Sequence, residues 1–429
     1  METKLLSEFY HLEEFRGIEG YQKHGGYEVL KKALKMQPQQ IIDEVKASGL
    51  RGRGGAGFST GTKWGFLPKN NEPRYLLCNA DEGEPGTFKD RLMMERAPHQ
   101  LIEGMIMSAF AIGSHKGYIY VRGEYFHPIA ILEKALKEAY AAGFLGKNIL
   151  GSGFDFELDV YSGAGAYICG EETGMISSLE GKKGQPKLKP PFPAIQGYLK
   201  KPTIVNNVET LAAVVPIIRD GAAAYKKFGT EKSAGTKLFS VSGNVVKPGT
   251  FEVPLGYSLK DIIYNLCGGL KPGRKLKAVI PGGSSAPVLT AEEAERATMD
   301  YECLAQMGSM LGSGAIIIID DQQCMVDLLD NLMHFYHHES CGQCTPCREG
   351  TGWLNKITHS ILQGRGRLQD IELLIKVADN MKGRTICALS DAAALPVLSF
   401  VTKYREEFEF YVREGHSKVR GVRHAEMHH

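Results

Sequence analysis

The sequence predicts an α/β fold followed by a small α+β domain and a C-terminal helical bundle. Three observations support this prediction. Strands and helices alternate between residues 75 and 161, hairpin and short-strand patterns occupy 238–320, and apolar residues follow helical spacing from Met325 onward. Alternating strands and helices are typical of a parallel sheet. We expect domain boundaries at 1–235, 236–325 and 326–429.

The composition is that of an ordinary globular protein. The chain has 429 residues, 43% hydrophobic and 23% charged, and its 51 Lys and Arg nearly balance its 49 Asp and Glu. Intrinsic disorder, collagen and coiled coil are excluded as the main class, and a general nucleic-acid binder would show a larger basic excess. No run approaches the roughly 20 apolar residues of a transmembrane helix, and the N-terminus is too acidic for a signal peptide. We expect a cytoplasmic protein, which a membrane-bound complex can still hold.

The first predicted domain contains two glycine-rich loops beside its strands. In chain order its elements are a helical segment at 1–50, a glycine-rich loop at 51–58, a strand at 75–79, a helix from Pro98, a strand at 118–121, a helix at 128–142, a strand at 156–161 and a second glycine loop at 163–165. A segment rich in Lys, Pro and Gly follows at 181–202, and such long connections are usually linkers or functional covers.

The remaining elements are shorter strands and then helices. The predicted set is a hairpin of 238–246 and 250–253, a short helix from Ser258 to Gly268, strands at 278–280 and 315–319, and helices from Met325, at 353–362, at 371–381 and at 392–411. The final His428 and His429 resemble a truncated purification tag.

Four of the nine cysteines have the spacing of an iron–sulfur site. Cys341, Cys344 and Cys347 form a C-x-x-C-x-x-C run, and Cys387 follows about forty residues later. A 4Fe–4S cube needs four converging thiolates, which a tight loop and one remote cysteine commonly supply. A structural zinc ion also binds four cysteines, but usually as two separated pairs. The pattern therefore favours iron–sulfur and leaves zinc as the alternative.

The glycine loops favour a nucleotide site. Successive glycines let backbone N–H groups converge on a phosphate, and Arg53 and Lys63 are available as counter-charges. The loop at 163–165 lacks the third glycine of a dinucleotide fingerprint at the standard offset. Tight packing without a ligand is the alternative for either loop, and the Arg-Gly run also permits RNA binding. Two such loops beside one sheet favour the nucleotide.

An acidic turn follows the strand at 75–79. Asp81, Glu82 and Glu84 stand just past the strand end, where open α/β sheets bind ligands. Carboxylates there can accept hydrogen bonds from ribityl or ribose hydroxyls, although a solvated turn is the simpler alternative. Glu171 and Glu172 stand at a predicted helix start, where the helix dipole favours acids in any case.

Three motifs give the sequence a family resemblance. They are GRGGAGF at 52–58, GAGAYICGEE at 163–172 and ESCGQCTPCREG at 339–350. Together, in this order, they resemble the NADH-binding flavoprotein subunit of respiratory complex I, the bacterial NADH:quinone oxidoreductase. Flavoprotein subunits of NAD-linked hydrogenases and formate dehydrogenases share these motifs, so a diaphorase subunit is the nearest alternative. A zinc-binding nucleotide-sensing module is a more distant one.

The resemblance implies a fold and a reaction. It implies a Rossmann-like FMN/NADH domain, a small ubiquitin-like (soluble-ligand-binding β-grasp) domain, and a helical bundle with a 4Fe–4S cluster. Hydride then passes from NADH to FMN, and single electrons pass to the cluster. The expected partners are a thioredoxin-like 2Fe–2S subunit and a larger iron–sulfur subunit that leads toward quinone. Through that complex the chain would lie peripherally on the inner face of the cell membrane.

The resemblance also implies roles for individual residues. Glu84 and Tyr167 should face the nicotinamide, and Glu172 should lie by the adenosine ribose, where its charge would repel a 2′-phosphate and favour NADH. The adenine should lie among Phe58, Phe66 and Phe192, with Lys189 nearby. The expected cluster ligands are Cys341, Cys344, Cys347 and Cys387. The other expected cofactor-binding residues are Gly52, Arg53, Gly54, Gly55, Lys63, Asn79, Asp81, Glu82, Gly170, Glu171, Asn206 and Asn207.

Overall fold

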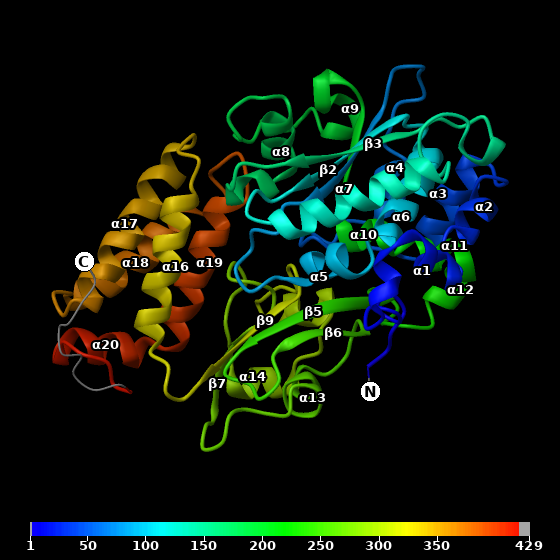
Figure 1. The fold of residues 1–429 in the computed structure, drawn as a ribbon. Coiled ribbons are helices and arrows are strands. Elements are labelled where there is room, and N and C mark those ends of the chain that lie inside the picture. Colours follow the sequence, from blue (N-terminus) through cyan, green and yellow to red (C-terminus); the bar gives the residue numbers. More distant parts are fainter. Residues whose placement is uncertain (1, 420–429) are drawn as a thin grey trace.

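Two β-sheets and a helical bundle organise the chain in a computed structural model that describes residues 2–419 (Figure 1). His428 and His429, which resemble a tag, lie outside the described residues. None of the helices within 2–419 is both long and apolar enough to span a bilayer. The sequence prediction of an α/β domain, a small α+β domain and a helical bundle is confirmed.

The first sheet is wholly parallel and has the strand order β3-β2-β1-β4. Its strands are β1 (Tyr75–Ala80), β2 (Lys116–Val121), β3 (Glu157–Ser162) and β4 (Thr203–Asn207). The chain builds outward from β1 to β3 and then returns to the other side of β1. The boundary between β1 and β4 is therefore a topological switch point, the place where open α/β sheets bind ligands.

The sequence did not predict β4. This strand is short, and its polar Asn206 and Asn207 end the apolar run that marks a buried strand. Helices cover the sheet, and α6 is the central one: it is buried along almost its whole length, and it contacts β1, β2 and α10. The helices of this region are α1 (Ile18–Lys23), α2 (Glu28–Ala33), α3 (Pro38–Ala47), α4 (Thr60–Trp64), α5 (Lys89–Arg96), α6 (Pro98–Ile112), α7 (Phe126–Ala141), α8 (Glu172–Leu179), α9 (Pro193–Gln196), α10 (Val208–Ala212), α11 (Val214–Asp220) and α12 (Ala222–Tyr225), with short 3-10 turns η1 (Glu13–Arg16), η2 (Ile149–Gly151), η3 (Tyr167–Gly170) and η4 (Tyr198–Lys200).

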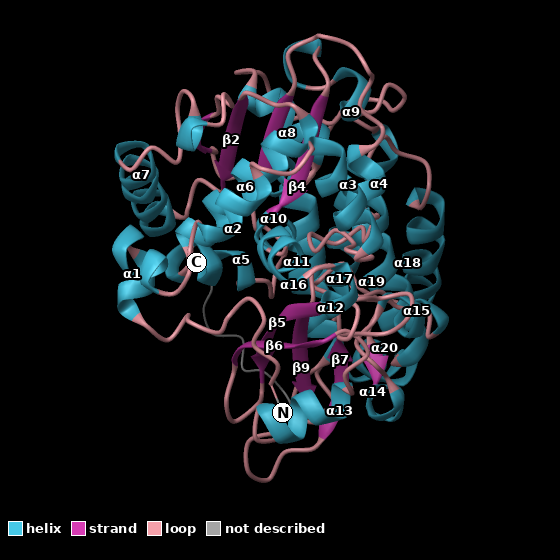
Figure 2. Ribbon diagram, turned by 90° about the vertical axis from the view of Figure 1, so that its right-hand side faces the viewer, coloured by secondary structure: helices cyan, strands magenta, loops and turns pink. Residues whose placement is uncertain are grey.

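The second sheet is mixed and has the order β6-β5-β9-β7-β8. The predicted hairpin is present, because β5 and β6 pair antiparallel. In Figure 2 this sheet lies below the first one, and α5 lies between them; the backbone N–H of Phe88 donates to Ser240 of β5 at 3.0 Å. The elements are β5 (Thr236–Gly243), β6 (Gly249–Pro254), β7 (Leu276–Ile280), β8 (Leu289–Thr290), β9 (Ala315–Asp320), α13 (Leu259–Asp261), the π-helical turn η5 (Ile262–Leu266), α14 (Ala291–Arg296) and α15 (Tyr301–Gln306).

The C-terminal helices form a bundle with its own apolar core (Figure 1). They are α16 (Met325–Glu339), α17 (Thr345–Leu362), α18 (Leu368–Met381), α19 (Leu389–Lys403) and α20 (Arg405–Glu414). Two boundaries differ from the prediction. The expected helix 392–411 is two helices, because Tyr404 leaves helical geometry at φ −122°. Helix α17 begins at Thr345 rather than near Trp353, so Cys347 lies in its first turn.

The contact between α6 and α10 gives a test of the fold. A Cβ at Gly104 of α6 would stand 2.2 Å from the carbonyl oxygen of Leu211 in α10, whereas a Cβ at Gly17 would find nothing closer than 3.9 Å. We expect Gly104→Ala to destabilise the protein by about 1–3 kcal/mol, since overpacking outweighs the gain in helix propensity. Gly17→Ala is the matched control. Thermal unfolding checks this, and equal melting temperatures for both variants would contradict it.

Candidate nucleotide and iron–sulfur site

A cavity of about 870 Å³ opens at the switch point between β1 and β4. Asn79 near the end of β1 is in register with Asn207 at the end of β4, and both side chains line the cavity. The volume is within the range that holds small ligands and cofactors. The lining residues are Gly52, Gly54, Gly55, Ala56, Gly57, Phe58, Lys63, Phe66, Asn79, Gly170, Glu171, Glu172, Lys189, Phe192, Pro193, Ala194, Ile195, Val205, Asn206 and Asn207.

The first glycine loop presents free backbone donors to this cavity. No acceptor within residues 2–419 takes a hydrogen bond from the N–H groups of Gly54, Gly55 or Ala56. Gly54 must be glycine or force a shift, because a Cβ there would stand 3.0 Å from the Cβ of Asn207. Gly55 has a φ of +139°, which L side chains rarely adopt. Free N–H groups on three consecutive residues can bind an anionic group such as a phosphate.

Two acids and two lysines also line the cavity. Lys189 donates to Glu171 at 2.9 Å and to Glu172 at 2.8 Å, and Lys63 donates to Glu172 at 3.1 Å and to the carbonyl of Val205 at 2.9 Å. Glu171 caps α8 by accepting from two backbone N–H groups. Burial opposes ionisation of Glu172, but the two lysines outweigh it and lower its pKa. Glu172 is therefore a fixed negative charge on the cavity wall.

Aromatic side chains stand at the mouth of the cavity. Phe58 and Phe66 have ring centroids 5.9 Å apart, and both are about half exposed, as is Phe192. Large apolar side chains that line a cavity and remain exposed are unlike core residues and fit a planar ligand. Ile195, which the sequence analysis did not single out, is also half exposed and lines the same cavity.

Three expected cofactor-binding residues do not line the cavity. The Arg53 guanidinium points away from it and donates to Tyr225 and to the carbonyls of Ala234 and Thr236, so its expected role as a counter-charge in the cavity is wrong in this geometry. The Glu82 carboxylate caps α5 instead, because it accepts from the first backbone N–H groups of that helix.

Asp81 is the third residue outside the lining, and one of its carboxylate oxygens lacks a protein partner within residues 2–419. Its Oδ1 atom is buried and has no hydrogen-bond partner among the described residues. Burial raises the pKa of Asp81 to about 7, and Arg122 opposes this. The carbonyl of Asp81 lies near Gly170, which lines the cavity. A buried polar atom without a partner is costly unless something binds it. The free N–H donors of the glycine loop and the size of the cavity fit FMN.

The pair expected at the nicotinamide lies where all three regions of the chain meet. Tyr167 donates to Glu84 at 2.6 Å. Glu84 also accepts from the backbone N–H of Ser285 at 2.8 Å and from its hydroxyl at 2.6 Å, on the loop after β7. Ser284 is 2.7 Å from the hydroxyl of Tyr336 in α16. No sequence motif identified Ser284, Ser285 or Tyr336 as site residues. Neither Glu84 nor Tyr167 lines the cavity described above.

A buried charge cluster supports the glycine loop from behind. We use this name for Arg53, Lys89, Asp90, Glu209 and Lys237, all of which are buried. Glu209 is 2.9 Å from Lys89 and 3.2 Å from Lys237. Burial alone would raise the pKa of Glu209, but Lys237, Lys89 and Arg53 lower it to about 2. Sequence reasoning missed Lys89, Glu209 and Lys237, since they are far apart in the chain and stand in no local pattern.

The four cysteines gather beside the cavity. Cys347 packs with Ile168 and Cys169 of η3, and Cys341, Cys344 and Cys387 pack against the same cluster. Gly170, the last residue of η3, lines the cavity, so this short turn separates the cysteines from the nucleotide site. Helices α17 and α19 begin at the cysteines, and their N-terminal dipoles favour a negatively charged group there.

The four cysteines supply the number and type of ligand that an iron–sulfur cube needs. Among residues 2–419, no three His, Cys, Asp or Glu side chains are placed to hold a single metal ion. Structural zinc sites usually take their cysteines as two separated pairs, whereas three cysteines in one loop with a remote fourth are common at iron–sulfur clusters. The donor set of four cysteines therefore fits a 4Fe–4S cluster.

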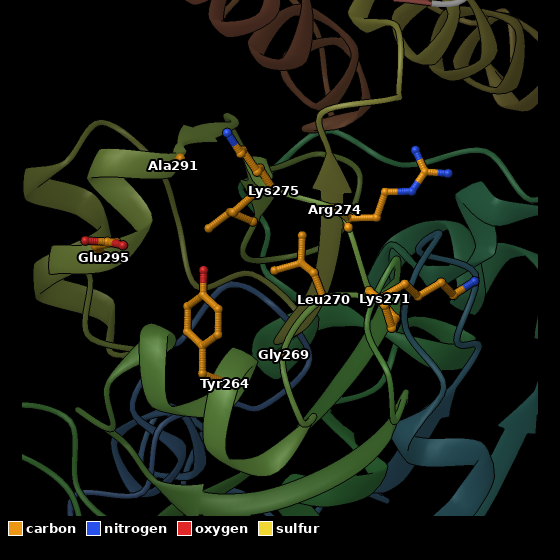
Figure 3. Close-up of a pocket in the computed structure, with 11 residues that line it drawn as sticks. Tyr264, Gly269, Leu270, Lys271, Arg274, Lys275, Ala291 and Glu295 are labelled. Carbon is orange, nitrogen blue, oxygen red and sulfur yellow. The ribbon is translucent and has the colours of Figure 1, made fainter.

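A second hollow lies on the smaller sheet domain and is unrelated to this site. It has a volume of about 560 Å³ and lies around Tyr264, Leu270 and Glu295. Figure 3 shows Lys271 and Arg274 extending away from the Tyr264 ring rather than toward a common point. None of the expected site residues lines it.

The fold and the site define a class of protein, a nucleotide-binding electron-transfer subunit in which a glycine-loop cavity adjoins a four-cysteine cluster. Family models match three parts of the chain. They are the Nuo51 FMN-binding domain at 45–216, the SLBB domain at 237–319 and the NADH-ubiquinone oxidoreductase-F iron-sulfur binding region at 327–411.

Close relatives agree with these matches. The chain is 52% identical over 396 residues to the F 2 subunit of NADH-quinone oxidoreductase from Rhizobium meliloti, covering 92% of this chain and 94% of the relative. It is 49% identical over 421 residues to the F subunit of NADH-quinone oxidoreductase from Mycobacterium tuberculosis, covering 96% and 94%. A crystal structure of an NAD+-reducing NiFe hydrogenase in its H2-reduced state matches with a TM-score of 0.81 at 39% identity, over 89% of this chain.

The chain belongs to the family of NADH-quinone oxidoreductase F subunits. The sequence prediction of an NADH dehydrogenase flavoprotein subunit with FMN and a 4Fe–4S cluster is thereby confirmed. The chain spans 64% of the length of the hydrogenase chain, so the remainder of that protein has no counterpart in this match.

Removing one cysteine tests the ligand set. Cys347→Ala should abolish the absorbance and the electron paramagnetic resonance of the cluster, because a cube then lacks one of its four thiolates. FMN and part of the NADH-dependent ferricyanide reduction should remain, since the cavity lies on the other side of η3. Cys303→Ala, on α15 and outside the cysteine group, is the control. An undiminished cluster signal in Cys347→Ala would remove this residue from the ligands.

Proposed function

We propose that the cavity holds FMN and the nucleotide NADH together, with the FMN phosphate at the free N–H groups of the first glycine loop. One observation carries this proposal: most of the residues expected to bind cofactor, although scattered from Gly52 to Asn207, line a single cavity at the switch point of the sheet. When bound, FMN supplies the acceptor for a hydride from NADH. Asn79, Asn206 and Asn207 line the cavity at the strand ends, where hydrogen bonds to Gly170, Trp64 and Asp90 hold their amides in place.

The outer part of the cavity suits the adenosine half of NADH. Phe58, Phe66 and Phe192 offer exposed aromatic faces for the adenine. Glu172 supplies a carboxylate that can accept from a ribose hydroxyl and repels a 2′-phosphate. Lys63 and Lys189 already pair with Glu172, so an incoming diphosphate would share these cations rather than meet a free charge.

Glu84 and Tyr167 act by orientation in this proposal. Tyr167 holds its proton toward Glu84, and both hydroxyl and backbone donors of Ser285 hold the other carboxylate oxygen. Glu84 is thus fixed in direction, and it can orient the nicotinamide carboxamide, or a water beside it, if the nicotinamide end of NADH extends past the lining residues of the cavity. Hydride transfer needs no proton from a side chain, so we assign neither residue as a general acid.

The electrons leave through the cysteine site in this proposal. We infer that a thioredoxin-like 2Fe–2S subunit and a larger iron–sulfur subunit receive them and lead toward quinone, and that these subunits hold the chain on the inner face of the membrane. We further propose functional boundaries at 1–235, 236–325 and 326–429, which place FMN, the small domain and the cluster in separate units.

A diaphorase subunit of an NAD-linked hydrogenase is the second candidate. The structural match to an NAD+-reducing hydrogenase favours it, but at lower identity than the relatives from NADH-quinone oxidoreductases. Purification of the complex from its native source distinguishes the two: membrane-arm subunits support the first, a NiFe subunit supports the second, and iron–sulfur subunits are expected in both.

Nucleotide choice tests the placement of NADH. Glu172→Gln should raise the ratio of kcat/KM for NADPH to that for NADH by about tenfold, because the variant no longer repels a 2′-phosphate. Glu180→Gln is a matched control: Glu180 also pairs with two lysines but does not line the cavity. Steady-state kinetics with both nucleotides measure the ratio. An unchanged ratio in Glu172→Gln would remove this residue from the ribose site.

A further inference from the structure

Lys237 reaches from the second sheet into the back of the glycine loop. It stands on β5, it is fully buried, and its ammonium group donates to the carbonyl of Arg53 at 3.1 Å. Glu209 of α10 lies 3.2 Å away, and the same carboxylate accepts from the backbone N–H of Leu238 at 2.8 Å. This lysine therefore connects a residue of the small domain with the loop that lines the cavity.

The first backbone groups of the glycine loop, at Gly52 and Arg53, form hydrogen bonds with protein partners. The N–H of Gly52 donates to the carbonyl of Phe58, and the carbonyl of Gly52 accepts from Tyr301 at 2.8 Å. The N–H of Arg53 donates to Thr210 at 2.8 Å. The next peptide unit, between Arg53 and Gly54, has its carbonyl bound to Lys237, and its N–H has no acceptor among the described residues.

Because a peptide unit is planar, the hydrogen bond to the carbonyl of Arg53 also fixes the direction of the Gly54 N–H. The cis peptides of the described chain are at Lys189-Pro190 and Pro190-Pro191, so the Arg53–Gly54 peptide is trans. In a trans peptide the C=O and N–H groups point in opposite directions. Because Lys237 holds the carbonyl on the buried side, the Gly54 N–H points to the opposite side, and Gly54 lines the cavity there.

We propose that Lys237 is a positioning residue that aims the Gly54 N–H at the phosphate of FMN, and that the small domain is thereby part of the cofactor site. This inference rests on the proposed placement of the FMN phosphate. The SLBB domain would then take part in binding FMN, and this role would not depend on a ligand bound in the hollow of that domain.

The surroundings of Lys237 leave it little other freedom. A Cβ at Gly314 would stand 2.4 Å from its Cε, so the neighbouring loop confines the side chain closely. Its other charged neighbours are Arg53, Lys89 and Asp90, which belong to the same buried charge cluster. A buried lysine is costly unless its donors are used. Here one donor is given to Glu209 and another to the loop carbonyl.

A plain structural clamp between two domains is the competing explanation, and the phosphate distinguishes the two. Riboflavin has the ring system and ribityl chain of FMN without the phosphate. Loss of a structural clamp would weaken binding of both flavins by the same factor, whereas loss of an aimed N–H would weaken FMN alone.

The experiment compares both flavins on full-length apoprotein, by quenching of flavin fluorescence. Lys237→Met should weaken FMN binding about tenfold or more and change riboflavin binding less than about twofold. The double variant Lys237→Met/Glu209→Gln removes both charges of this buried pair. It provides the same test if the single variant fails to fold. Glu252→Gln, a buried acid of β6 without contact to the glycine loop, is the control and should leave both affinities unchanged.

The outcomes separate the two proposals. Equal weakening of FMN and riboflavin in the folded Lys237 variants, or no weakening of either, would overturn the aiming role and leave the FMN site intact. Wild-type protein that binds FMN no more tightly than riboflavin would instead overturn the placement of the phosphate itself.

Discussion

The rest of the site depends on the ion pairs of Glu209 with Lys89 and Lys237. A loop that offers free N–H groups to a ligand cannot hydrogen-bond to itself on that side, so it must be held from the other side. Glu209 is the anion that stabilises two buried lysines there, at 2.9 and 3.2 Å. Removing one partner of such a buried network typically costs several kcal/mol, because the remaining charges stay buried. The conformation of this loop thus depends on residues of α5, α10 and β5.

Residues from separate parts of the chain also hold one another in place where its three regions meet. Glu84 follows β1, Ser285 follows β7, and Tyr336 belongs to the bundle, yet one hydrogen-bond network joins them. On the other side of η3 lie the cysteines. The nucleotide end and the metal end of the molecule are therefore separated by one short turn, and relative movement of the domains would disturb both.

Local patterns predicted the parts of the molecule that local chemistry determines. The strand–helix alternation, the hairpin at β5 and β6 and the cysteine motif were all readable, since each depends on neighbours in the sequence. Strand β4 was missed because Asn206 and Asn207 interrupt its apolar run. Arg53 was assigned to the cavity because its charge was visible, but its partners Tyr225 and Thr236 lie more than 170 positions along the chain. Lys237 was missed because its partners, Arg53 and Glu209, also lie far from it in the sequence.

One measurement tests the central claim most directly, namely that one chain couples an NADH-reducible flavin to an iron–sulfur cluster. It is an anaerobic absorption titration of the full-length protein, reconstituted with FMN, iron and sulfide. We predict a flavin band above a broad iron–sulfur shoulder, both bleached by one equivalent of NADH and only weakly by NADPH. A protein that stays colourless after reconstitution, or a bound flavin that NADH does not bleach, would contradict the account.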